Sequence, residues 1–193
     1  AREEFFKQKG EVPAGMPKEA WLELQLNQVL VETKAIDLLV MGRPEGSGCY
    51  CYINNVLRKY LDMLVKNYPF VIVDNEAGLE HLSRRTTQNV DYLLIVADYS
   101  LNGLRAADRI GQLAAELKLN VGNLSLIVNN APRTVSEHFM QELEKTGLQL
   151  CGMIPHDELV TQHDVDGKSL LELSEMSPAL TAVNAIAQDM FGK

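Results

Sequence analysis

The chain has 193 residues, 46% of them hydrophobic and 23% charged, which is enough apolar material for one sizeable core. It carries 26 acidic and 18 basic side chains, and the net charge of −8 argues against a nucleic-acid groove or a basic membrane-surface patch. No stretch approaches the roughly 18 uninterrupted apolar residues of a membrane span, and the first residues lack a signal sequence, so we expect a cytoplasmic protein.

Apolar runs rich in branched residues alternate with stretches of helical spacing along the chain. The runs predict strands at residues 36–41, 70–73, 92–97, 124–128 and, more weakly, 148–154. The helical stretches cover residues 21–31, 53–66, 101–117, 136–145 and 178–191. This alternation predicts one α/β domain over residues 1–193, a doubly wound and mostly parallel sheet with helices on both faces, after an irregular arm that ends at Pro17. Ligands of such sheets bind at the carboxyl ends of the strands.

Two cysteines flanked by glycines follow the first predicted strand. Residues 42–52 read Gly-Arg-Pro-Glu-Gly-Ser-Gly-Cys-Tyr-Cys-Tyr, and no lysine follows the glycines as a Walker phosphate loop requires, so we reject that interpretation. Cys49 and Cys51 lie at the N-terminal end of the predicted helix at 53–66, whose dipole favours thiolates that bind Zn²⁺ or Ni²⁺. Two thiolates do not complete a tetrahedral site, whereas two chains related by a two-fold axis supply four. The alternative is a pair of small, half-buried residues packed at an interface, and we expect the third cysteine, Cys151, in the core.

The predicted strand at residues 70–73 ends in carboxylates and a turn of small residues. Asp74 follows four apolar residues, the position at which P-loop ATPases hold Mg²⁺ through its water shell, and Glu76 follows it closely. Gly78 allows the backbone to approach a phosphate. The alternative is that Asp74 only ends the strand in a turn.

Polar residues also follow the later predicted strands. The strand at residues 124–128 ends in Asn129 and Asn130, and an asparagine amide matches the donor and acceptor edge of adenine. Pro155 and Asp157 follow the last predicted strand, where a proline turn can wall off a base. The alternatives are an asparagine turn and a helix cap at Asp157. The spacing of the other candidates for metal ligation does not match the cysteines, so we expect them on the surface: His138, His156 and His163.

Taken in order, these segments resemble one family over nearly the whole chain. The sequence is similar to CooC-type carbon monoxide dehydrogenase accessory ATPases, including the form that serves acetyl-CoA synthase, within the MinD, ParA and nitrogenase iron protein class of P-loop NTPases. The most specific resemblance lies in residues 41–51 and 74–81. The resemblance implies that Asp74 lies in a switch segment near Mg²⁺, with Glu76 and Gly78 close to the terminal phosphate of the nucleotide. It also implies a metal site at Cys49 and Cys51, shared by the two chains of a homodimer. The adenine pocket would be lined by Asn129, Pro155 and Asp157.

The same resemblance implies a function. It implies ATP or ADP with Mg²⁺ as cofactor, Ni²⁺ or Zn²⁺ at the cysteine pair, and a homodimer that ATP hydrolysis switches. The client would be carbon monoxide dehydrogenase or acetyl-CoA synthase, with nickel insertion as the task and neither nucleic acid nor membrane as a partner. Members of this class begin with a strand and a Walker loop that are not in this sequence, so we expect an N-terminal βαβ unit of about 60 residues to be missing. The chain alone is then expected to bind nucleotide weakly and to be inactive as an ATPase.

Two other functions are compatible with parts of this pattern. One is a non-catalytic module that dimerises around a metal bound by Cys49 and Cys51. The other is a positioning ATPase like MinD or ParA. The cysteine pair, the acidic net charge and the lack of a terminal amphipathic membrane helix or basic patch count against the positioning ATPase.

Overall fold

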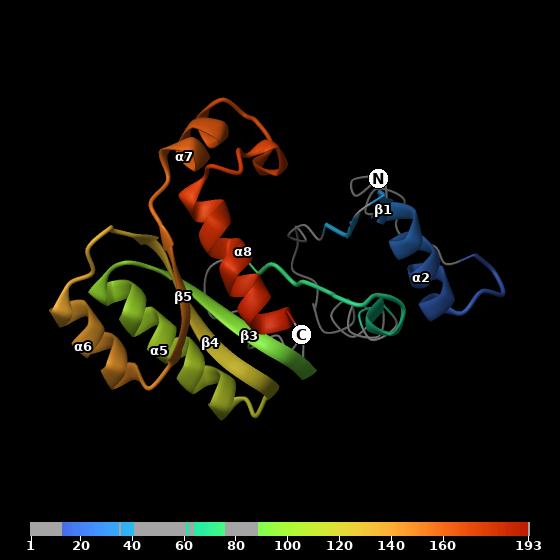
Figure 1. The fold of residues 1–193 in the computed structure, drawn as a ribbon. Coiled ribbons are helices and arrows are strands. Elements are labelled where there is room, and N and C mark those ends of the chain that lie inside the picture. Colours follow the sequence, from blue (N-terminus) through green and yellow to red (C-terminus); the bar gives the residue numbers. More distant parts are fainter. Residues whose placement is uncertain (1–12, 35, 41–60, 62–63, 76–88, 193) are drawn as a thin grey trace. The chain divides into compact units, whose positions relative to one another are not determined.

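A computed structural model describes residues 13–34, 36–40, 61, 64–75 and 89–192 (Figure 1). The chain divides into two compact units, residues 1–76 with 84–86 and residues 77–83 with 87–193. The prediction of a single domain stays a prediction. Within the described ranges, no helix is both long enough and apolar enough to cross a bilayer.

The described residues of the first unit include the helix α2 and a very short antiparallel strand pair. Its elements are α2 (Lys18–Val29), β1 (Val31–Glu32) and β2 (Asp37–Leu38). The turn between the strands is held by Asp37, whose Oδ1 accepts the Thr33 N–H at 3.0 Å and whose Oδ2 accepts the Tyr68 hydroxyl at 2.5 Å. Residues 61 and 64–67 are helical, so the helix predicted at 53–66 extends at least one residue further.

Two predicted buried strands of this unit are wrong for the residues described. Within 36–40, only Asp37–Leu38 is a strand, and Val40 is 71% exposed. The segment 70–75 contains no strand, and Ile72 is 91% exposed. The reason is physical, because an apolar run becomes a buried strand only where neighbouring strands satisfy its backbone on both sides. Among the described residues β2 pairs only with β1, and no strand pairs with 70–75.

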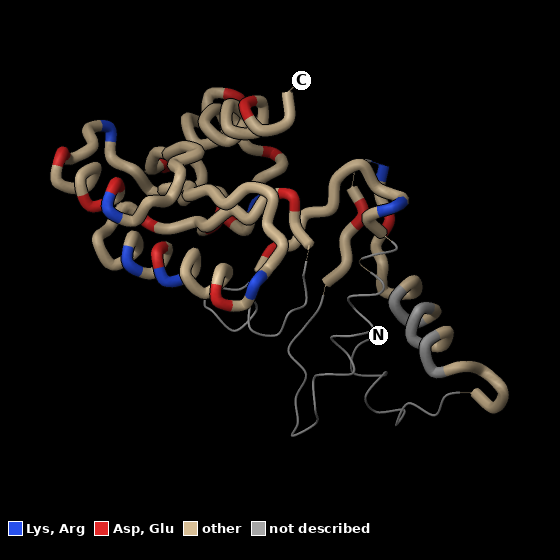
Figure 2. The backbone as a smooth tube through the Cα atoms, turned by 90° about the horizontal axis from the view of Figure 1, so that it is seen from below, with Lys and Arg blue, Asp and Glu red and all other residues tan. Residues whose placement is uncertain are grey.

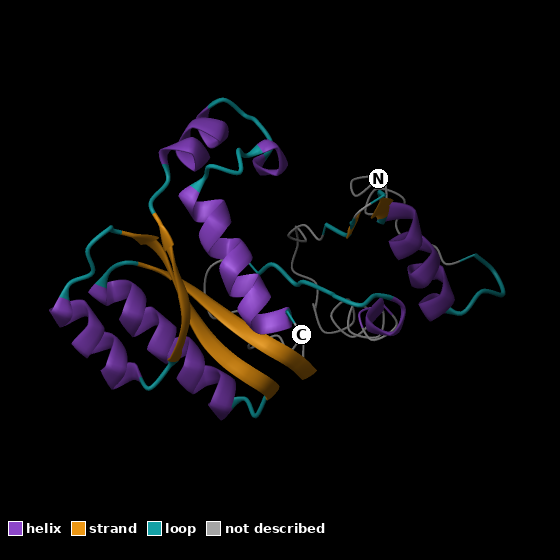
Figure 3. Cartoon of the chain, in the orientation of Figure 1, coloured by secondary structure: helices purple, strands orange, loops and turns teal. Residues whose placement is uncertain are grey.

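The second unit is an α/β layer with a three-stranded parallel sheet in the order β3-β4-β5. Its strands are β3 (Asn89–Asp98), β4 (Asn120–Ala131) and β5 (Gln149–Pro155). Its helices are α5 (Leu101–Glu116), α6 (Glu137–Thr146), α7 (Glu158–Val165), the 3₁₀ helix η1 (Leu170–Glu172) and α8 (Pro178–Phe191). Helices lie on both faces of the sheet (Figure 3). The three strands and the helices α5, α6 and α8 were predicted and are confirmed, whereas α7 has no clear apolar spacing and was missed.

The core lies between the sheet and helices α5 and α6. Alternate residues of β3 and β4 face this layer. Two of them, Ile95 and Leu126, are 3% and 0% exposed. The buried cluster consists of Ile95, Ala97, Leu104, Ala107, Leu126, Val128, Ala131, Phe139 and Leu143. Burying each of the larger side chains contributes about 1.5–3 kcal/mol, so this layer fixes the positions of the strands and of their ends.

Helix α8 covers only part of the opposite sheet face. It packs on β5, where Gly152 lies under Ile186, and its last turn places the Phe191 ring edge-on to Tyr92 at 5.2 Å between centroids. Beyond this contact, Leu94 and Val96 of β3 are 37% and 60% exposed. Acidic and basic positions are interspersed over this unit (Figure 2).

Candidate functional site

The polar residues predicted from the strand ends lie at one edge of the parallel sheet. Asp98 is paired with Asn129 in the β3–β4 register, and Ala131 is paired with Pro155 in the β4–β5 register. The backbone continues these pairings past the strands, because the Tyr99 N–H donates to the Asn129 carbonyl at 3.0 Å. The structure therefore brings Asn129 and Pro155 to the same edge of the sheet, the edge at which ligands of parallel sheets bind.

This edge contains an acidic residue that the sequence interpretation missed. The Asn130 Nδ2 donates to the Asp98 Oδ1 at 3.3 Å, which joins the ends of β3 and β4. Asn130 has a φ of 53°, the left-handed conformation that asparagine tolerates better than most residues. Asp98 ends an apolar run in the same way as Asp74 does, so the same pattern offered a signal for it.

Asp157 follows this edge and holds two helices together. It is 7% exposed; its Oδ1 accepts the Leu159 N–H at 2.8 Å, and its Oδ2 accepts the Ser177 hydroxyl at 2.5 Å and the Ala179 N–H at 3.1 Å. The hydrogen bond from Ser177, followed by those from backbone N–H groups, lowers the pKa of Asp157. The carboxylate thus caps α7 and anchors the start of α8, the alternative weighed from the sequence. Its place in an adenine pocket stays a prediction.

The other predicted site residues belong to the first unit or lie outside the described residues. Asp74 belongs to the first unit, where it is exposed. Glu76, Gly78, Cys49 and Cys51 lie outside the described residues. Within the described part of the chain, no group of three or more His, Cys, Asp and Glu residues is placed to hold a metal ion. Of the histidines, His138 and His156 are exposed and His163 is half-buried, and Cys151 is also half-buried.

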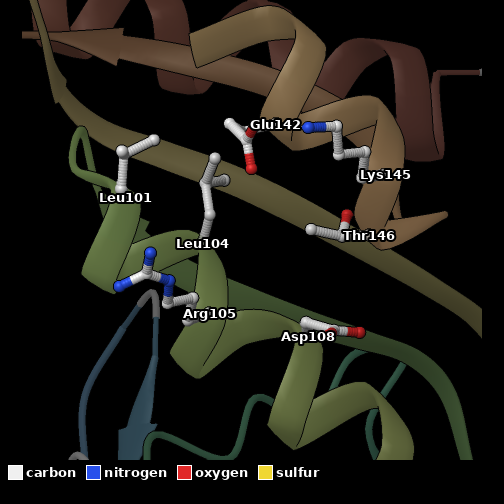
Figure 4. Close-up of a pocket in the computed structure, with 7 residues that line it drawn as sticks. All are labelled: Leu101, Leu104, Arg105, Asp108, Glu142, Lys145 and Thr146. Atoms are coloured by element: carbon white, nitrogen blue, oxygen red, sulfur yellow. Dashed lines mark hydrogen bonds and ion pairs between the residues drawn. The ribbon is translucent and has the colours of Figure 1, made fainter. Parts of the chain in front are cut away.

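A depression of about 130 Å³ opens elsewhere in the second unit, between helices α5 and α6 (Figure 4). Its lining comes from these two helices and consists of Leu101, Leu104, Arg105, Asp108, Glu142, Lys145 and Thr146. The Lys145 Nζ lies 2.5 Å from the Glu142 Oε1, and this hydrogen bond lowers the pKa of Glu142. Because this charged pair is already matched and faces solvent, the depression is a weaker candidate than the strand ends.

Comparison with known proteins shows to which class of proteins this chain belongs. No protein-family model matches the chain. The uncharacterized ATP-binding protein MJ0685 of Methanocaldococcus jannaschii is 44% identical over 100% of this chain and 77% of that protein. The carbon monoxide dehydrogenase accessory protein CooC of Rhodospirillum rubrum is 33% identical over 76% of this chain and 56% of that protein. The chain belongs to the MinD, ParA and CooC class of ATP-binding proteins.

Solved structures of the MinD and ParA class have the same fold as this chain. The MinD cell division protein of Aquifex aeolicus superposes with a TM-score of 0.66 at 21% identity, over 87% of this chain and 70% of that one. MinD of Pyrococcus horikoshii, in complex with Mg-ADP, superposes with a TM-score of 0.65 at 15% identity, over 94% and 76%. These similarities confirm the predicted α/β fold with its parallel sheet.

Proposed function

We propose that this chain binds ATP or ADP with Mg²⁺, only weakly when it is alone, and takes part in the ATP-dependent maturation of a carbon monoxide dehydrogenase or acetyl-CoA synthase. The observation that carries the nucleotide part is the edge where the polar residues Asp98, Asn129 and Asn130 lie with Pro155, in a chain 44% identical to an ATP-binding protein. The similarity to CooC, a carbon monoxide dehydrogenase accessory protein, supports the maturation role.

The strand ends suit a purine base. Asn129 is half-buried at the edge, and within the described residues no hydrogen bond engages its side-chain amide. An amide presents one acceptor and two donors, which match the edge of adenine. Pro155 offers an apolar wall beside it, and Asp157 holds the turn that follows Pro155.

The remaining proposed roles follow the resemblance of the sequence. Asp74 would hold Mg²⁺, with Glu76 and Gly78 near the terminal phosphate. When bound, Mg²⁺ neutralises charge on the phosphates. An exposed carboxylate such as Asp74 has the oxygen ligands that Mg²⁺ prefers. Nickel would be the cargo, held by Cys49 and Cys51 between two copies of the chain.

Replacing Asn129 with alanine tests the base site. Because the amide would supply hydrogen bonds to adenine, we expect the Asn129→Ala variant to bind ADP about tenfold more weakly. The measurement is an NMR titration of isotope-labelled protein with ADP and with GDP up to millimolar concentration. The matched control is Asn123→Ala, which removes an exposed asparagine near the opposite end of β4, where its Nδ2 donates to the Asp91 carbonyl at 3.4 Å. Equal ADP affinity in both variants and in the unaltered chain would contradict the base site.

Replacing both Cys49 and Cys51 with serine tests the metal site. We expect one Ni²⁺ or Zn²⁺ per two chains in the unaltered protein and none in the double variant, because serine hydroxyls bind these ions far more weakly than thiolates do. Metal content is measured by elemental analysis and association by analytical ultracentrifugation, with Cys151→Ser as the control that keeps the pair. Unchanged dimerisation in the double variant, together with no effect of chelators, would remove the metal bridge from the proposal.

Repeating the metal and association measurements with nucleotide, together with a nickel-incorporation assay, separates the maturation factor from a purely structural dimerisation module. A non-catalytic dimerisation module binds the metal equally well with and without nucleotide. A nucleotide-switched carrier changes its metal occupancy or its dimerisation when ATP and Mg²⁺ are added, and it increases nickel incorporation into an apo-dehydrogenase. Metal binding that ignores nucleotide, with no effect on the apo-dehydrogenase, would favour the structural module.

A further inference from the structure

Strand β4 contains a bulge at the residues that follow Val128. The β4–β5 register runs from Val128 opposite Met153 to Ala131 opposite Pro155, so β4 advances by three residues where β5 advances by two. On its other side β4 stays in register with β3 as far as Asn129, which lies opposite Asp98. The extra residue is therefore Asn130, and its φ of 53° is the left-handed conformation found at one class of β-bulge.

The bulge changes which residues face the core. In a regular strand, the residue that follows Leu126 and Val128 on the helix-covered face would be Asn130. The extra residue places Ala131 there instead, 4% exposed and part of the same buried cluster as Leu126 and Val128. The Asn130 amide is thereby kept out of that core and is exposed at the edge, while Asn129, on the opposite face of the strand, is half-buried.

The Asn130 side chain is tied to the neighbouring strand. Its Nδ2 donates to the Asp98 Oδ1 at 3.3 Å, and the Asp98 carbonyl accepts the Ser100 N–H at 2.7 Å in the turn that leads into α5. On the other side of the bulge, the His156 N–H donates to the Ala131 carbonyl at 3.1 Å. The bulge is thus fixed to both neighbouring strands, and Asn129 directly precedes it in β4.

We propose that Asn130 and Asp98 are positioning residues for purine recognition, which hold the bulge of β4 so that the Asn129 amide meets an adenine base beside Pro155. Neither residue needs to touch the base. This inference rests on the proposed nucleotide site. Bulges near binding sites commonly redirect a side chain in this way.

The test compares ADP and GDP binding in four variants by the NMR titration used for Asn129. Asn130→Ala loses the hydrogen bond and disfavours the left-handed backbone, and Asp98→Ala loses the acceptor. In both we expect the preference for ADP over GDP to fall about fivefold, the loss that one hydrogen bond or modest backbone strain produces. Asn130→Gly keeps the backbone conformation but still loses the hydrogen bond, so it is expected to match Asp98→Ala. Asp98→Asn keeps an Oδ1 acceptor and is expected to restore the preference.

The readout separates positioning from a general loss of structure. A purely structural role would lower the melting temperature without changing the ratio of ADP to GDP affinity, and Asp98→Asn would not rescue that ratio selectively. If Asn129→Ala weakens ADP binding while Asn130→Ala and Asp98→Ala keep the full preference, the positioning role is wrong and the base site stands. If Asn129→Ala binds ADP unchanged, the base site and the positioning role fail together. Should Asn130→Ala not fold, Asn130→Gly and Asp98→Ala decide the question.

Discussion

Replacing Gly152 with alanine is expected to lower the free energy of unfolding by about 1–3 kcal/mol, the usual cost of overpacking a filled core. A Cβ at this position would lie 2.6 Å from both Cγ1 and Cδ1 of Ile186 on helix α8. Ile186 is 8% exposed and branched at Cβ, so its side chain has little freedom to move away. In the absence of this clash, alanine in a strand would be slightly favourable, because glycine loses more chain entropy on folding.

The measurement is chemical denaturation of the variants in a double-mutant cycle. Ile186→Ala alone destabilises the protein by leaving a cavity, but combined with Gly152→Ala it removes the clash. We therefore expect the double variant to be more stable than the sum of the two single effects predicts. The matched control is Gly111→Ala, whose Cβ would meet first the flexible end of Leu148 at 3.1 Å. Additive effects of Gly152→Ala and Ile186→Ala would show that the close packing of α8 on β5 is not what requires the glycine.

Replacing Asp157 with alanine is expected to lower the melting temperature by about 5 °C, the effect of losing a helix cap in a chain of this size. The melting temperature falls further than it would on removal of an exposed carboxylate, because the Ser177 hydroxyl and the Ala179 N–H are left without their acceptor at the start of α8. Asp164→Ala on α7 is the control, since this substitution removes the same charge from an exposed position. Similar melting temperatures for the two variants would contradict the anchoring role.

The pH dependence of stability gives a second test of Asp157. Hydrogen bonds to the carboxylate, first that of Ser177, lower its pKa in the folded state, so the folded protein releases this proton more readily than the unfolded chain. The resulting stability is present above the ordinary aspartate pKa of 3.8 and is lost as the pH falls through the lower folded value. The stability difference between the unaltered chain and Asp157→Asn is expected to be largest at neutral pH and to shrink in acid. A difference that does not depend on pH would contradict an ionised anchor.

Comparing the two units shows where the local sequence pattern is enough to predict a helix or a strand. In the second unit, the apolar run of β4 and the amphipathic spacing of α5 predict the elements observed. Each element there finds a neighbour of matching type, so the local preference and the tertiary environment agree. In the first unit, the equally apolar run at 70–73 is not a strand in the described structure, because no neighbouring strand pairs with it.

Some features of the candidate site were likewise predictable from the sequence, whereas others depended on the tertiary structure. The sequence by itself determined that Asn129 and Pro155 stand at the ends of apolar runs, and that parallel strands bring their ends to one edge, since both follow from period and order along the chain. Only the tertiary structure decided that Asp98 meets Asn130, that β4 bulges at Asn130, and that Asp157 links α7 to Ser177 at the start of α8. These contacts join residues 20 to 32 positions apart, and register and packing between separate elements set them, which no local pattern encodes.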